Sequence, residues 1–351
     1  MKIIIIGGGW YGCHIATILK SAHDITIIEQ HNDIFINSSY YNQNRLHLGF
    51  HYCRDYNTRK LCQNNYNRFL KTYADCVDNI DDNYYAIADN STIDFQTFSH
   101  IYEFEKHEFE IHNNINFANV HNKLILTKEK VINSDKIVAH FKTQLSDINL
   151  ILNTKVSKYI KQNDEIIVYG NNAQYACDLL IDCTYNQLEL SKKSYTYELT
   201  LSLIYQKFLN VNFGALTIMD GKFNSLYPRD IGAGIYTLTD VEFTPIMVSN
   251  NYADVNSYIP DIEEIAEIRE KMVAKMNHYY PLFEENFEYK SYFLSKKTKM
   301  LSKTDSRDIT IEEIEPNVIS VNCGKIYGIF EFEDYMLKYL ELNQNQISSN
   351  F

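Results

Sequence analysis

Met1-Lys2-Ile3-Ile4-Ile5-Ile6-Gly7-Gly8-Gly9-Trp10-Tyr11-Gly12 opens the sequence, and this stretch decides the fold class. Residues 3–6 are apolar and β-branched, which is typical of a parallel strand buried on both faces. Apolar residues at helical spacing follow the glycines up to residue 21, and a second apolar run, 25–28, ends at Glu29. A strand, a glycine-rich turn, a helix and a second strand within about 30 residues predict a Rossmann-like βαβ unit.

The three glycines Gly7, Gly9 and Gly12 fit the pattern G-x-G-x-x-G. They allow a tight turn, close approach of the backbone to a pyrophosphate, and close packing of helix on strand. Glu29 is placed to accept hydrogen bonds from a ribose diol, and its charge disfavours a 2′-phosphate. The alternative is a turn of an α/β protein that binds no ligand. Further candidate cofactor contacts beside these are Trp10, Tyr11 and Gln30.

The composition of the chain excludes several classes of binding partner. Its 351 residues include 33 Lys and Arg against 45 Asp and Glu, a net charge of -12 that repels nucleic acids and anionic lipid surfaces. No apolar run approaches the roughly 20 residues that span a bilayer. The seven cysteines are scattered without a CxxC pair, which favours reduced thiols and no metal site. We therefore expect a cytoplasmic protein with a small-molecule substrate, and its oligomeric state stays open.

A second motif follows the second predicted strand, and it carries a family resemblance. The run is Asn37-Ser38-Ser39-Tyr40-Tyr41-Asn42-Gln43-Asn44-Arg45-Leu46-His47-Leu48-Gly49-Phe50-His51-Tyr52. It resembles the second FAD-binding stretch of D-amino-acid-oxidase-type, glutathione-reductase-like flavoproteins. From Asn44 onward it is similar to a signature of bacterial FAD-dependent oxidoreductases often found near surface-polysaccharide genes. That signature usually continues with Pro-Arg, whereas here Cys53 replaces the proline and Arg54 remains.

The resemblance implies FAD as the cofactor, and the side chains of the run suit it. Ser38 and Ser39 offer hydroxyls to phosphate oxygens, Asn44 offers an amide, and Arg45 offsets charge. The resemblance places further FAD contacts at Leu46, His47, Val156, Cys183, Thr184, Gly324, Lys325 and Ile326. Two of these segments depart from the family pattern, since Cys183-Thr184-Tyr185 replaces Ala-Thr-Gly and Tyr327 stands where Asp is common.

The resemblance also implies how the domains are arranged along the chain. We predict an α/β protein in which a Rossmann-like FAD-binding domain of the GR2 type is interleaved with an α+β substrate domain built on an antiparallel sheet. The predicted FAD-binding domain covers 1–75, 145–190 and 305–351, and the substrate domain covers 76–144 and 191–304. Periodicity predicts helices at 58–74 and 261–279, strands at 84–88 and 100–104, and strands of the large sheet at 196–205, 213–219, 225–227 and 234–240.

Candidates for the substrate side come from the same resemblance. Such oxidases place a substrate-binding arginine shortly before the last flavin strand, and Arg307 lies there; its alternative is a surface ion pair. Tyr227 belongs to a strand that lines the cavity in this fold, and its alternative is a core aromatic. His47 and His51 complete the predicted catalytic set, with Tyr52 and Arg54 as further candidates for the cavity.

The predicted function is an FAD-dependent oxidoreductase that transfers a hydride from a small amine, amino acid or sugar-like substrate to the flavin. One alternative is a flavoenzyme without net redox change, similar to UDP-galactopyranose mutase. Another is a non-catalytic flavoprotein.

Overall fold

The computed structural model describes residues 1–162, 165–301 and 309–349. The chain separates into two compact units. The first unit comprises Met1–Tyr40, Val138–Thr196 and Thr298–Phe351, and the second comprises Tyr41–Ile137 and Tyr197–Lys297. Residues 41–75, expected with the FAD-binding domain, cluster with the second unit because β3 (Arg45–Leu46) pairs with β8 (Lys130–Ile132) of that unit.

A six-stranded sheet forms the centre of the described part of the first unit, in the order β20-β21-β13-β1-β2-β9. The pairings from β21 to β9 are parallel, and β20 joins β21 in antiparallel direction. The apolar runs 3–6 and 25–28 form the neighbouring strands β1 and β2, as predicted. The strands are β20 (Thr310–Glu315), β21 (Val318–Asn322), β13 (Leu179–Asp182), β1 (Lys2–Ile6), β2 (Asp24–Ile28) and β9 (Asn149–Ile151).

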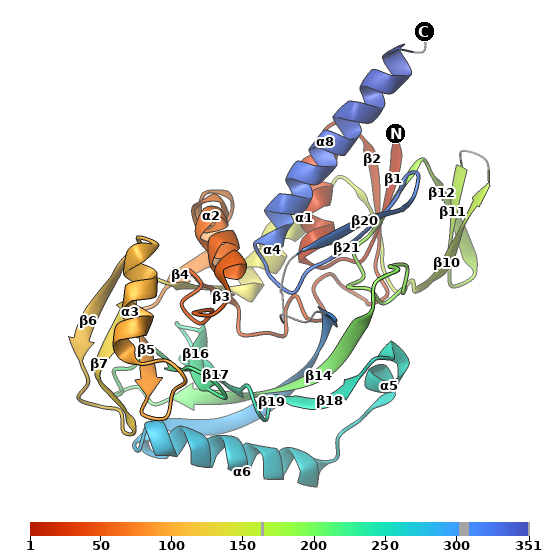
Figure 1. Cartoon of the computed structure of the whole chain (residues 1–351). Coiled ribbons are helices and arrows are strands. Elements are labelled where there is room, and N and C mark those ends of the chain that lie inside the picture. Colours follow the sequence, from red (N-terminus) through yellow and green to blue (C-terminus); the bar gives the residue numbers. More distant parts are fainter. Residues whose placement is uncertain (163–164, 302–308, 350–351) are drawn as a thin grey trace. The chain divides into compact units, whose positions relative to one another are not determined.

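The two faces of this sheet are covered differently. Helices α1 (Trp10–Leu19) and α8 (Gly328–Ser349) lie side by side, and α1 packs on β1 and β2 (Figure 1). Alternate residues of β1 point the other way, where Ile4 and Ile6 join a core cluster with the small sheet β10-β11-β12. The small sheet consists of β10 (Val156–Gln162), β11 (Glu165–Gly170) and β12 (Ala173–Cys177).

The second unit is built on a larger sheet, in which the described strands follow the order β18-β14-β17-β16-β15-β5-β7-β6, with β19 paired to β14. The strands predicted between 196 and 240 pair in antiparallel direction, whereas β15 pairs with β5 in parallel. The strands are β14 (Tyr195–Lys207), β15 (Ala215–Met219), β16 (Asn224–Asp230), β17 (Ile235–Asp240), β18 (Pro245–Ser249), β19 (Phe287–Met300), β5 (Asn83–Ala88), β6 (Phe109–Asn113) and β7 (Val120–Thr127).

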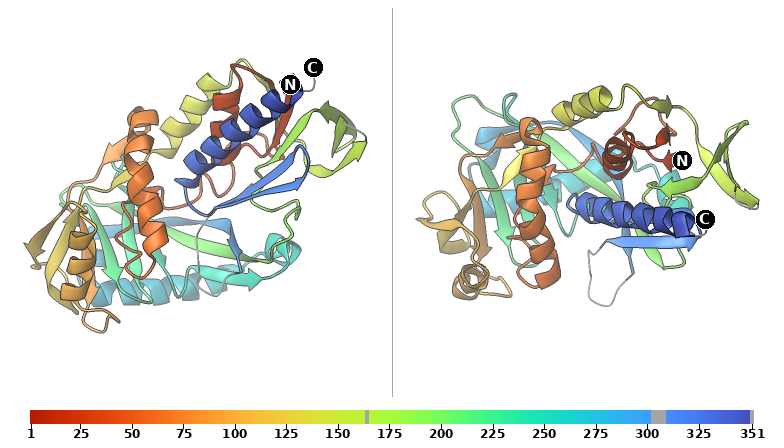
Figure 2. Two further views of the ribbon diagram at one scale, coloured as in Figure 1. Left: turned by 45° about the horizontal axis from the view of Figure 1, so that its top comes forward. Right: turned by 90° about the horizontal axis from the view of Figure 1, so that it is seen from above.

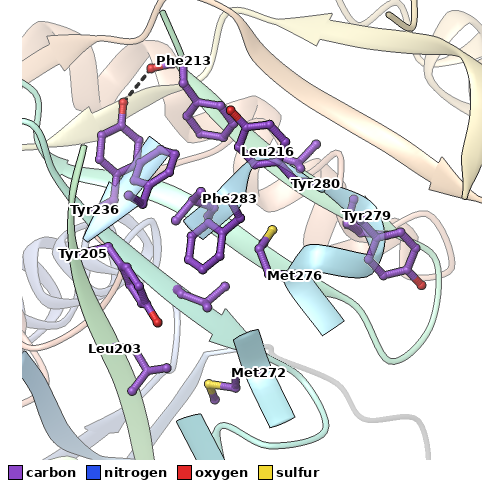
Figure 3. Close-up of a cluster of buried hydrophobic side chains, with 14 of the residues drawn as sticks. Leu203, Tyr205, Phe213, Leu216, Tyr236, Met272, Met276, Tyr279, Tyr280 and Phe283 are labelled. Atoms are coloured by element: carbon purple, nitrogen blue, oxygen red, sulfur yellow. Dashed lines mark hydrogen bonds between the residues drawn. The ribbon is translucent and has the colours of Figure 1, made fainter. Parts of the chain in front are cut away.

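One face of the large sheet carries the main core of the second unit. Helix α6 (Ile262–Tyr279) runs along this face in Figure 1 and in the left view of Figure 2, and its N-cap Asp261 accepts a hydrogen bond from the Glu264 amide. Met272 and Met276 of α6 are fully buried against aromatic and aliphatic side chains of the strands (Figure 3). The strand side chains in this cluster include Leu203, Tyr205, Leu216, Leu226, Tyr236 and Leu238.

The remaining elements connect these layers. The strand predicted at 100–104 is wrong, because these residues end helix α3 (Phe95–Phe104), which buries Phe98 and Tyr102 on one face and is capped by Asp94. Among the described residues no helix is long and apolar enough to cross a membrane. The other elements are α2 (Tyr56–Thr72), the 3₁₀ turn Ala74–Cys76, β4 (Val77–Asn79), α4 (Ser134–Gln144), α5 (Tyr252–Ser257) and α7 (Phe283–Asn286).

Candidate active site

The glycine turn of the first unit leaves no room for side chains. Gly7 has a φ of 104°, and a Cβ atom on it would lie 2.7 Å from the Cys183 carbonyl oxygen. A Cβ on Gly9 would lie 2.6 Å from Ser39 Oγ, and one on Gly12 only 1.9 Å from the carbonyl oxygen of Gly7. Gly7 and Gly12 face backbone atoms and cannot carry a side chain, whereas a Cβ on Gly9 would require the Ser39 hydroxyl to move. The turn thus brings bare backbone to the end of β1.

Glu29 stands at the carboxyl end of β2, next to this turn. Its side chain is largely buried, and its two oxygens accept hydrogen bonds from the Gly8 amide at 2.7 Å and the His31 amide at 2.9 Å. Each carboxylate oxygen keeps capacity for another donor, such as a ribose hydroxyl. The neighbouring Gln30 instead bonds the Gln187 side chain.

The first residues of α1 have distinct roles. The Trp10 amide donates to Ser39 Oγ at 3.0 Å, while the Trp10 ring packs edge-on against Phe35 and Phe141 in the core. Ser38 precedes Ser39 in the loop after β2 and is half-buried. Of these residues, the Trp10 backbone and the hydroxyl of Ser39 lie at the helix N-terminus, where the dipole favours an anion.

Tyr11 ties α1 to the turn before α8. Its hydroxyl donates to the Lys325 carbonyl oxygen at 2.7 Å, and a Cβ on Gly328 would lie 2.2 Å from that hydroxyl. Burial raises the pKa of Tyr11 well above its usual value, so this donor stays protonated. Gly324 is exposed in the same turn, and Lys325 and Ile326 are half-buried.

An acid that sequence reasoning missed organises the end of β13. Asp182 is fully buried and accepts hydrogen bonds from the Thr184 amide and the Ser320 hydroxyl, both at 2.9 Å. Burial raises its pKa, and these hydrogen bonds oppose the rise. The adjacent Cys183 amide donates to the Ile6 carbonyl. Val156 is buried in the core cluster under the sheet.

These groups gather where parallel strands β1, β2, β13 and β21 end. Ligands of doubly wound folds bind outside the carboxyl ends of such strands. A bare glycine turn, a helix N-terminus and a fixed carboxylate fit the diphosphate and ribose of a dinucleotide.

Asn44, Arg45 and Leu46 belong to the second unit. Asn44 has a φ of 53°. Its side-chain amide donates to Ser134 Oγ, and its backbone amide donates to the side-chain oxygen of Asn42. Leu46 is fully buried. The bonds of Asn44 fix the start of β3, and they place the side chain of Arg45 at the large sheet.

Arg45 lies across the face of the large sheet opposite α6. Its guanidinium carbon is 4.0 Å from the centroid of the Tyr227 ring, and Nη2 donates to Ser225 Oγ. The Nε atom of Arg45 has no hydrogen-bond partner in the described part of the chain. Tyr227 is fully buried and its hydroxyl donates to the Lys130 carbonyl at 3.0 Å, so this tyrosine supports Arg45 through its ring.

The face that Arg45 covers is polar although it is buried. Register places Ser202, Thr217, Ser225 and Thr237 on one side of their strands, and leucines at the alternate positions face α6. These four side chains are between 0% and 5% exposed. Tyr85 pairs with Thr217 and shares this face. A buried polar face on a well-packed sheet is a suitable surface for a small polar ligand.

The predicted catalytic histidines lie together in the loop after β3. The ring centroids of His47 and His51 are 4.4 Å apart, and those of His51 and Tyr52 are 4.2 Å apart. Nδ1 of His51 is 3.2 Å from the Tyr85 hydroxyl. The loop therefore brings its aromatic side chains to the polar face through Tyr85.

Buried side chains from distant elements hold the backbone of this loop. Glu129 accepts a hydrogen bond from the Leu48 amide at 2.6 Å, and Tyr102 donates to the Phe50 carbonyl at 2.8 Å. Arg59 of α2 donates to the Tyr52 and Cys53 carbonyls.

Arg59 is itself fixed by an ion pair. Its guanidinium contacts the Glu105 carboxylate at 2.6 Å, and both side chains are less than 10% exposed. Sequence reasoning missed Glu129, Arg59 and Glu105, because single charged residues separated by tens of positions carry no local pattern.

Two other candidates lie elsewhere. Arg307 lies outside the described residues. Arg54 pairs with the buried Asp220 at 3.2 Å, and Thr92 also donates to that carboxylate. Arg54 is 67% exposed, and it neutralises an acid at the end of β15.

Comparison with known proteins agrees with this geometry. Residues 5–72 match the family model of the NAD(P)-binding Rossmann-like domain. The chain is 31% identical over 343 residues to the FAD-dependent monooxygenase FPY4 of Fusarium mangiferae, covering 96% of this chain and 90% of that protein. The structure resembles the amino acid oxidase NikD in its open form, with a TM-score of 0.73, 10% identity, and coverage of 93% and 91% of the two chains. It equally resembles FAD-bound L-α-glycerophosphate oxidase of Mycoplasma pneumoniae, with a TM-score of 0.73, 13% identity, and coverage of 97% and 94%.

The solved structures show a D-amino-acid-oxidase-like fold, and the similarity to FPY4 shows that the chain is an FAD-dependent oxidoreductase. The chain belongs to the family of FAD-dependent oxidoreductases that includes FPY4. The predicted cofactor, FAD, and the predicted fold class are confirmed, and the non-catalytic alternative is set aside because the relatives are enzymes.

Proposed function

We propose that the enzyme oxidises a small polar substrate at a carbon that bears an amine or a hydroxyl, and that this substrate binds the polar face of the second unit. The observation that carries the proposal is Arg45, which lies on the Tyr227 ring with Nε available for an acceptor. A carboxylate or a hydroxyl of the substrate would accept from this guanidinium. Amino acids and sugar-like acids have this chemistry.

FAD supplies a two-electron acceptor for the hydride of such a substrate. The residues of the chain then have to bind the substrate, orient it and remove a proton from it. Arg45 orients the substrate, and Thr217, whose hydroxyl has no partner among the described residues, offers a second polar contact on the same face. His51 is the candidate proton acceptor in this scheme, because a neutral imidazole takes a proton near pH 7.

Anaerobic mixing of the FAD-loaded enzyme with amino acids, amines, hydroxy acids and sugars tests this proposal. At least one class should bleach the flavin absorbance in a concentration-dependent manner. Arg45→Met should weaken substrate binding by about 10- to 100-fold, because a hydrogen bond to a charged group contributes about 1.5–3 kcal/mol. Arg54→Met is the matched control, since Arg54 is mostly exposed and paired with Asp220. Bleaching by none of the classes, or equal effects of both variants, would contradict the proposal.

The similarity to FPY4 favours a second candidate function, insertion of one oxygen atom into the substrate. The two reactions differ in what becomes of molecular oxygen. Turnover under ¹⁸O₂ followed by mass spectrometry of the product distinguishes them. Label in the product would favour the monooxygenase, and an unlabelled product two hydrogens lighter than the substrate would favour the oxidase.

A further inference from the structure

Glu129 is a buried acid that bonds the backbone of the predicted catalytic loop and also bonds Tyr85 of β5, which contacts His51 of that loop. It lies between β7 and β8 and is 1% exposed. One carboxylate oxygen accepts from the Leu48 amide at 2.6 Å, and the other accepts from the Tyr85 hydroxyl at 2.7 Å. The Phe50 amide is a further donor to this carboxylate. A carboxylate surrounded by donors is an acceptor only.

The hydroxyl of Tyr85 has one proton, and its direction determines the next contact. Because Tyr85 donates that proton to Glu129, its oxygen can only accept at the 3.2 Å contact with His51 Nδ1. His51 must then carry a proton on Nδ1, and in the neutral ring Nε2 is the basic nitrogen. We propose that Glu129 is a positioning residue, whose ionised carboxylate acts through Tyr85 to set the tautomer of His51.

Four groups around Glu129 favour its ionised form. Burial raises the pKa of Glu129 above its usual value, and the Tyr85 hydroxyl, the guanidinium of Arg45 and the two loop amides oppose this rise. The other titratable side chains that face it are phenols of Tyr66 on α2, Tyr102 on α3 and Tyr227 on β16. The pKa values of these phenols are raised, so they are neutral at pH 7 and leave Arg45 as the opposing charge.

The assignment has a direct chemical consequence. With the proton fixed on Nδ1, Nε2 is the basic nitrogen of the His51 ring, and the proposed proton transfer from substrate would use that atom. This consequence rests on the proposed function, because it requires a substrate beside His51. The tautomer itself does not depend on turnover, so the two ideas fail independently.

The two variants Glu129→Gln and Tyr85→Phe separate the relay from the loop contacts. In Glu129→Gln the amide oxygen is retained for the Leu48 and Phe50 donors, so the amide NH₂ faces Tyr85. Tyr85 then accepts from the amide and donates to His51, which places the ring proton on Nε2. Tyr85→Phe removes the link without touching the loop amides. Tyr102→Phe is the matched control, because it also removes a buried tyrosine hydroxyl, and that hydroxyl bonds the loop through the Phe50 carbonyl.

The measurement is ¹⁵N NMR of the FAD-loaded full chain with labelled histidine, where His51→Gln identifies the His51 signals. We expect His51 to be protonated on Nδ1 in the unmodified protein and in Tyr102→Phe, and on Nε2 in Glu129→Gln. In Tyr85→Phe we expect the ¹⁵N signals of a mixture of the two tautomers in place of those of one tautomer. A proton on Nε2 in the unmodified protein overturns the proposal. So does an unchanged pattern in Tyr85→Phe, which also decides the question if Glu129→Gln does not fold.

Discussion

The β1–α1 turn and the loop 47–53 differ in what holds them, although each presents polar groups at the end of a strand. The turn follows β1, which pairs with β2 and β13, and its glycines fit against neighbouring backbone. The loop has little regular structure of its own, and its amides and carbonyls bond to Glu129, Tyr102 and Arg59 instead.

The two regions also differ in how the residues that fix them are distributed along the sequence. The sequence motif that specifies the turn is contained in about 30 consecutive residues, the length of a βαβ unit. The loop depends on residues 59, 102, 105 and 129, which come from other helices and strands. Changes at the turn should therefore act through steric exclusion, and changes around the loop through buried charge.

The largest effect is expected for Gly12→Ala. A Cβ atom 1.9 Å from the Gly7 carbonyl oxygen cannot be accommodated by a side-chain rotation, because the backbone fixes the position of the Cβ and the atom it meets is a backbone atom. We expect a loss of at least about 3 kcal/mol of stability and loss of bound FAD, seen in thermal unfolding and flavin absorbance. In the control Gly232→Ala the nearest atom is 3.5 Å away, so the variant should behave like the parent protein. An FAD-loaded Gly12→Ala protein of normal stability would contradict the steric account.

Glu105→Ala should have the next largest effect. Removing the carboxylate leaves the Arg59 guanidinium buried without its partner, which costs about 3–5 kcal/mol in comparable buried pairs. Denaturant unfolding measures the loss. Glu108→Ala is the control, because Glu108 is 82% exposed in its pair with Lys128 and should change the unfolding midpoint very little. Equal midpoints for the two variants would mean that the ion pair does not hold the loop.

For the first unit, Glu29→Ala should weaken FAD binding by about 10- to 100-fold, because a ribose hydroxyl loses a charged acceptor. Titration of the apoprotein with FAD, followed by flavin fluorescence, measures the change. Asp147→Ala removes a carboxylate of the same unit that is 65% exposed and pairs with Lys20. Its dissociation constant should equal that of the parent, and the same value for Glu29→Ala would remove Glu29 from the site.

The smallest effect concerns pH. Burial raises the folded-state pKa of Asp182, so the proton bound by Asp182 stabilises the fold below the usual carboxyl range, and this contribution is lost as pH rises through the raised value. Asp182→Asn removes that titration while keeping an acceptor for Thr184. As the pH rises above the usual carboxyl range, the melting temperature of the parent should therefore fall more than that of the variant. Parallel pH profiles would show that Asp182 does not titrate there.

The sequence predicted the first unit well for a physical reason. Ile3–Ile6, the glycines and Glu29 act through local geometry, and a local pattern reports local geometry. Helix α6 was equally predictable, because its apolar face repeats at helical spacing. The strand predicted at 100–104 was wrong because a five-residue window showed apolar and polar alternation, while the helical spacing of Phe95, Phe98 and Tyr102 extends over a longer segment.

In the second unit, the contacts around the loop could not be predicted from local sequence patterns. Glu129 lies between two lysines and reads as a surface turn, yet it is buried because β7 and β8 bring it under the loop. Tyr227 was weighed as a catalytic residue or a core aromatic, and its buried ring under Arg45 depends on the pairing of β16 with β15. Such contacts follow from the register of strands far apart in sequence.

Alternate residues of the strands give the large sheet a polar face and an apolar face. Ser202, Thr217, Ser225 and Thr237 point to the face that Arg45 covers, while their neighbours at 201, 216, 226 and 238 point to α6. If the substrate binds this face as proposed, substitution at the polar positions would change the preferred substrate while every leucine that anchors α6 is kept. Insertion of a single residue within β15 or β16 would exchange the two faces. We expect homologues to diversify by substitution within these strands and by length changes only in the connections between them.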